Sequence, residues 1–242
     1  MVSRRRGRII LATLGAVIIA AMVWFEGSLV LTRHKAGKLL RDVQAMKLGE
    51  STLEDVRRLQ KQYGGISQKE NGSVCSGDDC SFYGIPIYNW ALEKGLALRW
   101  RVLHASAVWC NPCCDLAPWR VLWVGIYVKG GPVIRIEVFI HSRGSDGFIR
   151  AGHVQIVSQM PHGREPVRTG YCVYPFHMTT PGGGKGIAAT IAPGASARDR
   201  LRAFQINLRC VTTLRGCRER EEIMPAVWED HEEYLRLHQS SR

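Results

Sequence analysis

Eight cysteines are the residues of this sequence whose type and spacing could carry chemistry. They form three local groups and one isolated residue: Cys75 and Cys80; Cys110, Cys113 and Cys114; Cys210 and Cys217; and Cys172. Paired cysteines form disulfides in an oxidising compartment, bind zinc as thiolates, or exchange disulfides with a substrate. As the simplest arrangement, we expect local bridges from Cys75 to Cys80 and from Cys210 to Cys217. Cys172 is then expected to pair with one member of the middle group, for which Cys114 is a candidate.

A redox-active pair is the alternative for the middle group. Trp109-Cys110-Asn111-Pro112-Cys113 resembles the W-C-x-P-C motif of thioredoxin-like oxidoreductases, in which a helix N-terminus lowers the pKa of the first cysteine. The resemblance implies a thiol-disulfide oxidoreductase that uses Cys110 and Cys113. However, Pro118 would break a helix that begins at this motif, and no strand-helix-strand run surrounds it. We therefore expect structural bridging and assign no catalytic residue, with the oxidoreductase as the alternative.

The sequence carries little support for other catalytic or metal sites. Cys75 and Cys80 together with Cys110 and Cys113 have spacings that could hold zinc, an interpretation that requires a body in the cytoplasm. The histidines form no HxH, HxxxH or HExxH pattern. Residues 180–186 are rich in glycine, but they lack the Lys-Ser/Thr pair that opens a helix in a phosphate-binding loop. We therefore predict no metal and no cofactor.

The N-terminal segment predicts a membrane anchor. Arg4, Arg5, Arg6 and Arg8 precede the run Ile9–Phe25, which contains no charged residue. Its 17 residues lie at the short end of the ~17–25 that span a bilayer. A cleaved secretory signal has a shorter apolar run that ends in small residues, whereas this run ends in Met22-Val23-Trp24-Phe25. We therefore predict an uncleaved anchor at residues 1–31, with a transmembrane segment at about 9–25 or slightly longer.

The orientation of the anchor follows from charge and from cysteine usage. The N-terminal arginines favour a cytoplasmic N-terminus, although Arg33, Lys35, Lys38 and Arg41 also lie close to the apolar run on its other side. An even number of cysteines behind an export signal favours disulfides outside the cytoplasm. We predict a single-pass protein of the inner (cell) membrane, with one extracytoplasmic α+β domain at residues 32–242.

The chain is basic, and its charge narrows the expected partners. Lys and Arg number 33 against 21 Asp and Glu, which gives a net charge of +12. A basic body beside a membrane favours anionic lipid headgroups or acidic envelope partners. We expect no nucleic-acid partner, because an exported body would rarely meet one and no RNP, zinc-finger or recognition-helix signature occurs.

Residue patterns predict an α+β body in the order helix pair, antiparallel sheet and C-terminal helices. Helices are expected over 31–48 and from a capping box at Ser51–Glu54 to Tyr63. Strands are expected at 81–87, 119–128, 133–141, 153–158, 167–178 and 186–191, with a hairpin turn at 129–132. Further helices are expected over 89–94, from Ser196 through Arg209, and from Pro225. Ile136 should face the core, and Glu137 should lie on the opposite face, where a change of charge is expected to be mild.

Two resemblances extend over parts of the chain. Leu48-Gly49-Glu50-Ser51-Thr52-Leu53-Glu54-Asp55-Val56 resembles a helix start in small envelope lipoproteins of the outer-membrane-assembly type, although no lipobox cysteine follows the apolar run. The whole layout is similar to bacterial single-pass membrane-anchored proteins of unknown function. That likeness rests on Ala203–Cys210, on Gly216-Cys217 and on Met224-Pro225-Ala226-Val227-Trp228, and it implies no activity. The sequence therefore predicts a membrane-tethered envelope protein that acts by binding or scaffolding and contains structural disulfides.

Overall fold

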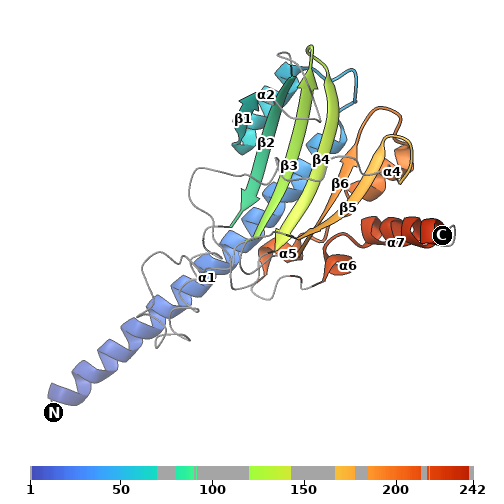
Figure 1. The fold of residues 1–242 in the computed structure, drawn as a ribbon. Coiled ribbons are helices and arrows are strands. Elements are labelled where there is room, and N and C mark those ends of the chain that lie inside the picture. The colour runs from blue at the N-terminus through green and yellow to red at the C-terminus, as the bar shows by residue number, and fades with distance from the viewer. Residues whose placement is uncertain are drawn as a thin grey trace, which may run out of the picture.

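One antiparallel sheet and the helices that pack on it make up the described part of the chain. The computed structural model describes residues 2–69, 80–89, 91, 120–142, 167–177, 185–213, 217 and 219–239. A long helix comes first, a short helix and six strands follow, and helices close the chain (Figure 1). This order confirms the predicted α+β class. The expected strand at 153–158 and most of the expected helix at 89–94 fall outside the described residues.

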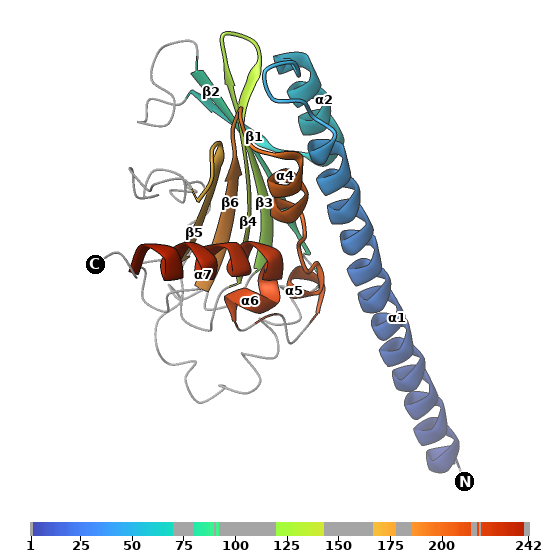
Figure 2. The same ribbon diagram turned by 90° about the vertical axis from the view of Figure 1, so that its right-hand side faces the viewer.

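The first helix, α1 (Val2–Gln44), is continuous from the arginine cluster into the body. Its 43 residues correspond to a rod about 64 Å long. The predicted boundary at residue 31 is therefore not a break in the helix, and Glu26-Gly27-Ser28 remain helical. The first part of α1 projects from the body, whereas its last part buries Ala36, Leu39 and Val43 completely (Figures 1 and 2). The apolar segment and the core are thus joined by a single rigid element.

The second helix, α2 (Leu53–Tyr63), begins one residue later than the sequence indicates. Thr52 is the N-cap, and its backbone N–H donates to the Asp55 carboxylate at 2.9 Å. Ser51, the expected cap, instead accepts a hydrogen bond from the backbone N–H of Lys47 at 2.9 Å. Val56, Leu59 and Tyr63 are buried along one side of α2, as the periodicity predicts. The capping box is therefore real but is formed by Thr52 and Asp55.

The strands form one sheet in the order β1-β2-β3-β4-β6-β5, and all described neighbours are antiparallel. They are β1 (Ile66–Lys69), β2 (Cys80–Tyr88), β3 (Arg120–Lys129), β4 (Val133–Ser142), β5 (Tyr171–His177) and β6 (Lys185–Ile191). The β3–β4 hairpin turns at Gly130 and Gly131, whose φ angles of 61° and 110° favour glycine. The predicted hairpin is confirmed, whereas β1 was not expected from the sequence.

The C-terminal helices are shorter than their sequence periodicity indicates. They are α4 (Ala197–Ala203), α5 (Arg209–Thr212), α6 (Arg220–Ile223) and α7 (Pro225–Gln239). The expected helix from Ser196 through Arg209 ends early, and Leu201, expected inside, is 53% exposed. The chain leaves the helix because the backbone N–H of Asn207 donates to the carbonyl of Ile223 and its side-chain amide donates to that of Glu222. Contact with α6 therefore overrides the local helical preference.

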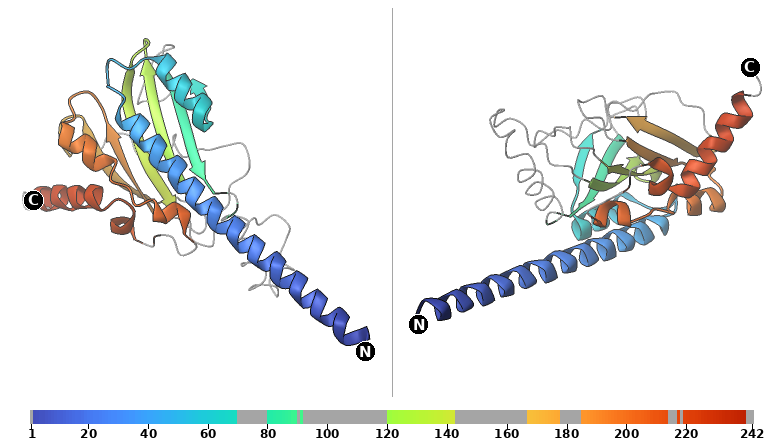
Figure 3. Two further views of the ribbon diagram at one scale, coloured as in Figure 1. Left: turned by 180° about the vertical axis from the view of Figure 1, so that it is seen from behind. Right: turned by 90° about the horizontal axis from the view of Figure 1, so that it is seen from below.

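The helices cover one face of the sheet, and the main core lies between them. Residues from α1, α2, α4, α5, α6 and α7 join one apolar cluster with alternate residues of the strands, including Ile85, Val124 and Ile136. Figures 2 and 3 show α1 and α4 on the same side of the sheet. The opposite face is also buried: Phe82, Trp123 and Glu137 are 1%, 3% and 0% exposed. The expectation that a charge is tolerated at position 137 is therefore wrong.

Candidate binding groove and cysteine sites

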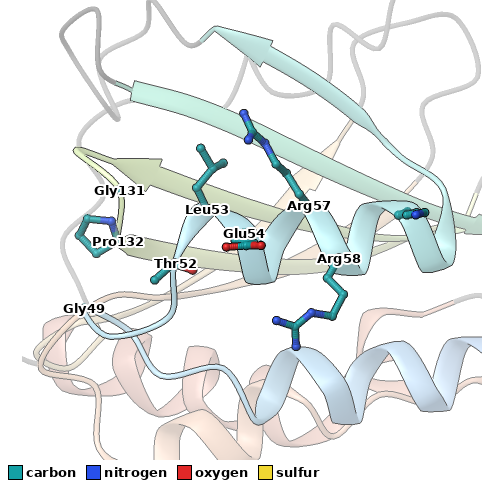
Figure 4. Close-up of a pocket in the computed structure, with 9 residues that line it drawn as sticks. Gly49, Thr52, Leu53, Glu54, Arg57, Arg58, Gly131 and Pro132 are labelled. Carbon is teal, nitrogen blue, oxygen red and sulfur yellow. The ribbon is translucent and has the colours of Figure 1, made fainter.

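An open groove lies where α2 meets the turn of the β3–β4 hairpin (Figure 4). The segment before α2 is held along the hairpin by backbone hydrogen bonds: Gly49 N–H to Val133 C=O, Val133 N–H to Ser51 C=O, and Leu53 N–H to Gly131 C=O, at 2.8–3.0 Å. The groove has a volume of about 1100 Å³. Its lining is formed by Gly49, Thr52, Leu53, Glu54, Arg57, Arg58, Lys61, Gly131 and Pro132. These backbone hydrogen bonds thus hold the start of α2 and the hairpin turn, which form the two sides of the groove, next to each other.

Three cationic side chains and one carboxylate line this groove. Arg57 and Lys61 are four residues apart on α2, a spacing that places them on the same side of a helix. Arg58 contacts the Asp55 carboxylate at 3.1 Å, so part of its charge is balanced locally. The backbone N–H of Thr52 holds the pKa of Asp55 below its usual value, although partial desolvation opposes this effect. The groove therefore presents a net positive surface to solvent.

The groove lies at the end of the body that is far from the N-terminus of α1. Figures 1 and 3 show α2 and the β3–β4 turn at one end, while α1 leaves the body at the other. The 20 residues from Phe25 to Gln44 are helical, so Gln44 lies about 28 Å from Phe25 along the helix axis. The sequence contained one signal for this site, the i, i+4 pair of Arg57 and Lys61, but not the approach of Gly131 and Pro132. A ligand in the groove would thus be held away from the apolar end of α1.

The two cysteines nearest the C-terminus form a disulfide. The Cα atoms of Cys210 and Cys217 are 4.8 Å apart, within the range that a bridge requires, and the sulfur atoms are bonded. Both side chains are buried, and the amide of Asn207 lies 3.8 Å from the Cys217 sulfur. Cys210 is in α5, which packs against α1. The bridge expected from the sequence therefore fastens the chain next to the helix that carries the apolar segment.

Removing this bridge should weaken the C-terminal helices and leave the sheet folded. For a closed loop of this length, the chain-entropy model gives a loss of about 2 kcal/mol for the double substitution Cys210→Ser/Cys217→Ser. Amide hydrogen exchange should report faster exchange in α5 and α6, with unchanged protection in β3 and β4. Equal loss of protection in the sheet would contradict a local role of the bridge.

The other cysteines give a mixed result. Cys80 at the start of β2 is disulfide-bonded, so in this structure it is not a thiolate ligand for zinc. Its expected partner, Cys75, lies outside the described residues, as do Cys110, Cys113 and Cys114. Cys172 is a free, half-buried thiol, so its expected disulfide with the middle group is wrong. Burial raises the pKa of Cys172 and nearby Arg135 only partly opposes it, which is typical of an unreactive thiol.

A polar cluster lies on the sheet face opposite the helices. The register places five residues in one row across the sheet: Gly84, Gly125, Glu137, Thr190 and Cys172. The hydroxyls of Tyr127 and Thr190 donate to the Glu137 carboxylate at 3.3 and 3.4 Å. The guanidinium of Arg135 donates to Thr190 at 3.3 Å and lies 5.4 Å from the centre of the Tyr127 ring. The buried carboxylate is therefore held by hydroxyl donors within this layer.

The two glycines of this row give aromatic rings room against the sheet. A Cβ atom at position 125 would lie 2.8 Å from the ring of Phe82, and one at position 84 would overlap the ring of Trp123. Phe82 stacks on Trp123 with an interplanar angle of 11° and also contacts the Tyr127 ring. The row is thus packed with aromatic side chains, which favours a structural role for Glu137.

A second charged cluster joins α7 to β5 and α4. Arg168 contacts Asp199 at 2.6 Å, Asp230 at 3.0 Å and Glu233 at 3.2 Å. Arg202 contacts Asp230 at 2.9 Å, and the hydroxyl of Tyr171 donates to the same carboxylate at 3.1 Å. Burial alone would raise the pKa of Asp199, but hydrogen bonds from Ser196 and Arg168 bring it below its usual value. Because the buried carboxylates of Asp199 and Asp230 both have cation or hydroxyl partners, this cluster stabilises the fold.

The described residues contain no group of three or more His, Cys, Asp or Glu side chains placed to hold a metal ion. Residues 9–44 of α1 are long and apolar enough to include a membrane-spanning segment. Comparison of the chain with protein-family models, with curated proteins and with solved structures finds no match. The features of the described residues that bear on function are the apolar helix, the disulfides and the basic groove.

Proposed function

We propose that this chain is a single-pass envelope protein of the bacterial inner membrane whose body, outside the cytoplasm, binds an acidic macromolecular partner. The N-terminal part of α1 is apolar and exposed, as Leu11, Val17 and Val23 illustrate with exposed fractions of 60–69%. Such a surface is unfavourable in water and suits a lipid bilayer. The disulfide between Cys210 and Cys217 supports an oxidising compartment for the body.

The observation that carries the binding proposal is the basic groove at the end of the body far from the apolar segment. Arg57, Arg58 and Lys61 outnumber Glu54 along its lining, and the whole chain has a charge of +12. Complementary charge guides association and sets partner choice. The helical rise of α1 places Gln44 about 28 Å from Phe25, and the groove lies at the Gln44 end of the body, so an acidic partner in the envelope suits it better than headgroups of the anchoring membrane. No catalytic group is required for this role.

Binding is tested with the full chain in detergent micelles and fluorescently labelled polyglutamate as the acidic probe. The double reversal Arg57→Glu/Lys61→Glu should weaken binding at least about tenfold, because attraction in the groove becomes repulsion. Binding to the unchanged protein should also weaken as salt is added, since both groups are exposed.

A matched control separates the groove from the overall charge. Arg198→Glu/Arg236→Glu reverses two exposed cations outside the groove and changes the net charge equally. It should change the affinity by less than about threefold, since the reversed charges lie away from the binding surface. Equal losses in both variants, or no binding by the unchanged protein, would contradict the proposal.

A further inference from the structure

The two sides of α1 differ where the helix enters the body. Leu29 is 7% exposed and packs against Phe25, whereas Val30 and Leu31 are 62% and 70% exposed. Asn89, which follows β2, donates from its amide to the carbonyl of Ser28 at 2.9 Å and to the hydroxyl of Thr32 at 2.7 Å. At this level the body therefore contacts one side of α1, while Val30 and Leu31 leave the other side apolar and exposed.

The distance from the apolar run to the body is shorter than the thickness of a headgroup layer. Ser28, whose carbonyl accepts a hydrogen bond from Asn89, is three residues after Phe25, which is a rise of about 4.5 Å along the helix. A bilayer of about 40–45 Å with a hydrocarbon core of about 30 Å leaves about 5–8 Å for each headgroup layer. If the hydrocarbon core ends near Phe25, Ser28 and its hydrogen bond from Asn89 lie within that layer.

The residues of the body at this level suit a membrane interface. Tyr88 precedes Asn89 and is 37% exposed, and tyrosine is enriched at the level of lipid headgroups. Arg33 of α1 donates to the hydroxyl of Thr212 in α5 at 3.1 and 3.2 Å, which places α5 beside the same turn of α1. Arg209, in the same short helix, is exposed. We call the exposed residues Arg33, Tyr88 and Arg209 the rim, because Asn89 and Thr212 are only 3% and 0% exposed. Figures 1 and 2 show α5 beside α1 where the helix leaves the body.

We propose that the rim docks into the phospholipid headgroup layer of the membrane that α1 crosses. Tyr88 would insert its ring among the headgroups. Arg33 lies about 12 Å beyond Phe25 along α1, so its guanidinium group and that of Arg209 would meet lipid phosphates from the outer edge of this layer. Val30 and Leu31 would face the same layer on the other side of α1. Glu26, an exposed carboxylate, limits the depth because it must stay hydrated, so the rim does not enter the hydrocarbon. The docked body leaves the groove directed away from the membrane.

This inference rests on the proposed membrane anchor, and the test separates the two. The full chain is placed in nanodiscs of equal parts phosphatidylcholine and phosphatidylglycerol, with the photo-crosslinking residue benzoylphenylalanine at one position at a time. The positions are Leu14 within the apolar run, Tyr88 in the rim, and Lys47, an exposed residue near the groove end of the body. Lipid adducts are detected by mass spectrometry after illumination.

Adducts are expected at Leu14 and Tyr88, with a yield at Tyr88 about tenfold above that at Lys47. Adducts at Leu14 with none above the Lys47 level at Tyr88 would overturn the docking of the rim and leave the anchor intact. No adduct at Leu14 would overturn the anchor and, with it, this inference.

Discussion

Replacing Glu137 by lysine is expected to lower the free energy of unfolding by about 3–5 kcal/mol, because a cation would replace a carboxylate at a fully buried site. Glu137 is 0% exposed and accepts hydrogen bonds from the hydroxyls of Tyr127 and Thr190. Lysine cannot accept either bond and would also place a second cation beside Arg135. Urea denaturation of the full chain in detergent, followed by tryptophan fluorescence, measures the change.

Two further substitutions calibrate this result. Glu137→Gln keeps the shape and an oxygen acceptor, so a smaller loss of about 1–2 kcal/mol is expected. Glu50→Lys makes the same charge change at an exposed site, where about 0.5 kcal/mol or less is expected. A loss for Glu137→Lys no larger than that for Glu50→Lys would mean that position 137 is solvated.

Replacing Arg168 by alanine is expected to cost about 3 kcal/mol, because two nearly buried carboxylates lose a shared cation. The side chains of Asp199 and Asp230 are only 4% and 2% exposed. The Arg168 side chain is one-third exposed, so water can solvate part of the carboxylate charge once the guanidinium is removed. The loss of unfolding free energy should therefore lie at the low end of the range of about 3–5 kcal/mol for breaking a buried ion pair. Faster hydrogen exchange in α7 should accompany the loss, since the cluster joins that helix to β5.

The same cluster predicts how stability depends on acid. The pKa of Asp199 lies below its usual value in the folded protein, so its ionised form favours folding near neutral pH. This contribution is present above the unfolded-state pKa of about 3.9 and is lost as pH falls through the lower folded pKa. The urea concentration at the midpoint of unfolding should therefore decrease as the pH drops below about 4. This decrease should be less steep for the Arg168→Ala variant. Parallel curves for both proteins would contradict the assigned role of Arg168.

Local sequence patterns predicted the features that depend on neighbours in the chain. The β3–β4 hairpin, α2 with its apolar side, α7 from Pro225 and the bridge from Cys210 to Cys217 all involve short separations. The capping box was displaced by one residue because Ser51 bonds to Lys47 instead. Patterns of this kind specify which residues share a side but not what covers that side.

Apart from the displaced cap, the features that the sequence misassigned or did not reveal involve contacts between distant parts of the chain. Alternation placed Glu137 opposite Ile136, but it could not reveal that the second face is packed with the rings of Phe82, Trp123 and Tyr127. Arg168 meets Asp199 and Asp230 across 31 and 62 residues, and no spacing rule links them. The groove likewise depends on the approach of Gly131 to Leu53. Tertiary packing, which a single sequence does not specify locally, decides these features.

The continuous α1 has a consequence for how the body moves. Because the apolar segment and core residues such as Leu39 belong to one helix, a tilt of the anchor must tilt the body with it. The bonds from Asn89 to Ser28 and Thr32, and from Arg33 to Thr212, hold the body against the helix at its point of exit. The groove and the rim are therefore expected to keep a fixed relation to the membrane.

The location of the body outside the cytoplasm is the claim on which the disulfides and the envelope partner both depend. It is tested most directly by fusing alkaline phosphatase or green fluorescent protein after Arg242 and expressing each fusion in a bacterial host. Phosphatase needs an oxidising compartment for its own disulfides, whereas the fluorescent protein exported unfolded through the membrane does not become fluorescent. We predict an active phosphatase fusion and a dark fluorescent-protein fusion. A fluorescent fusion with an inactive phosphatase would place the body in the cytoplasm and contradict the account.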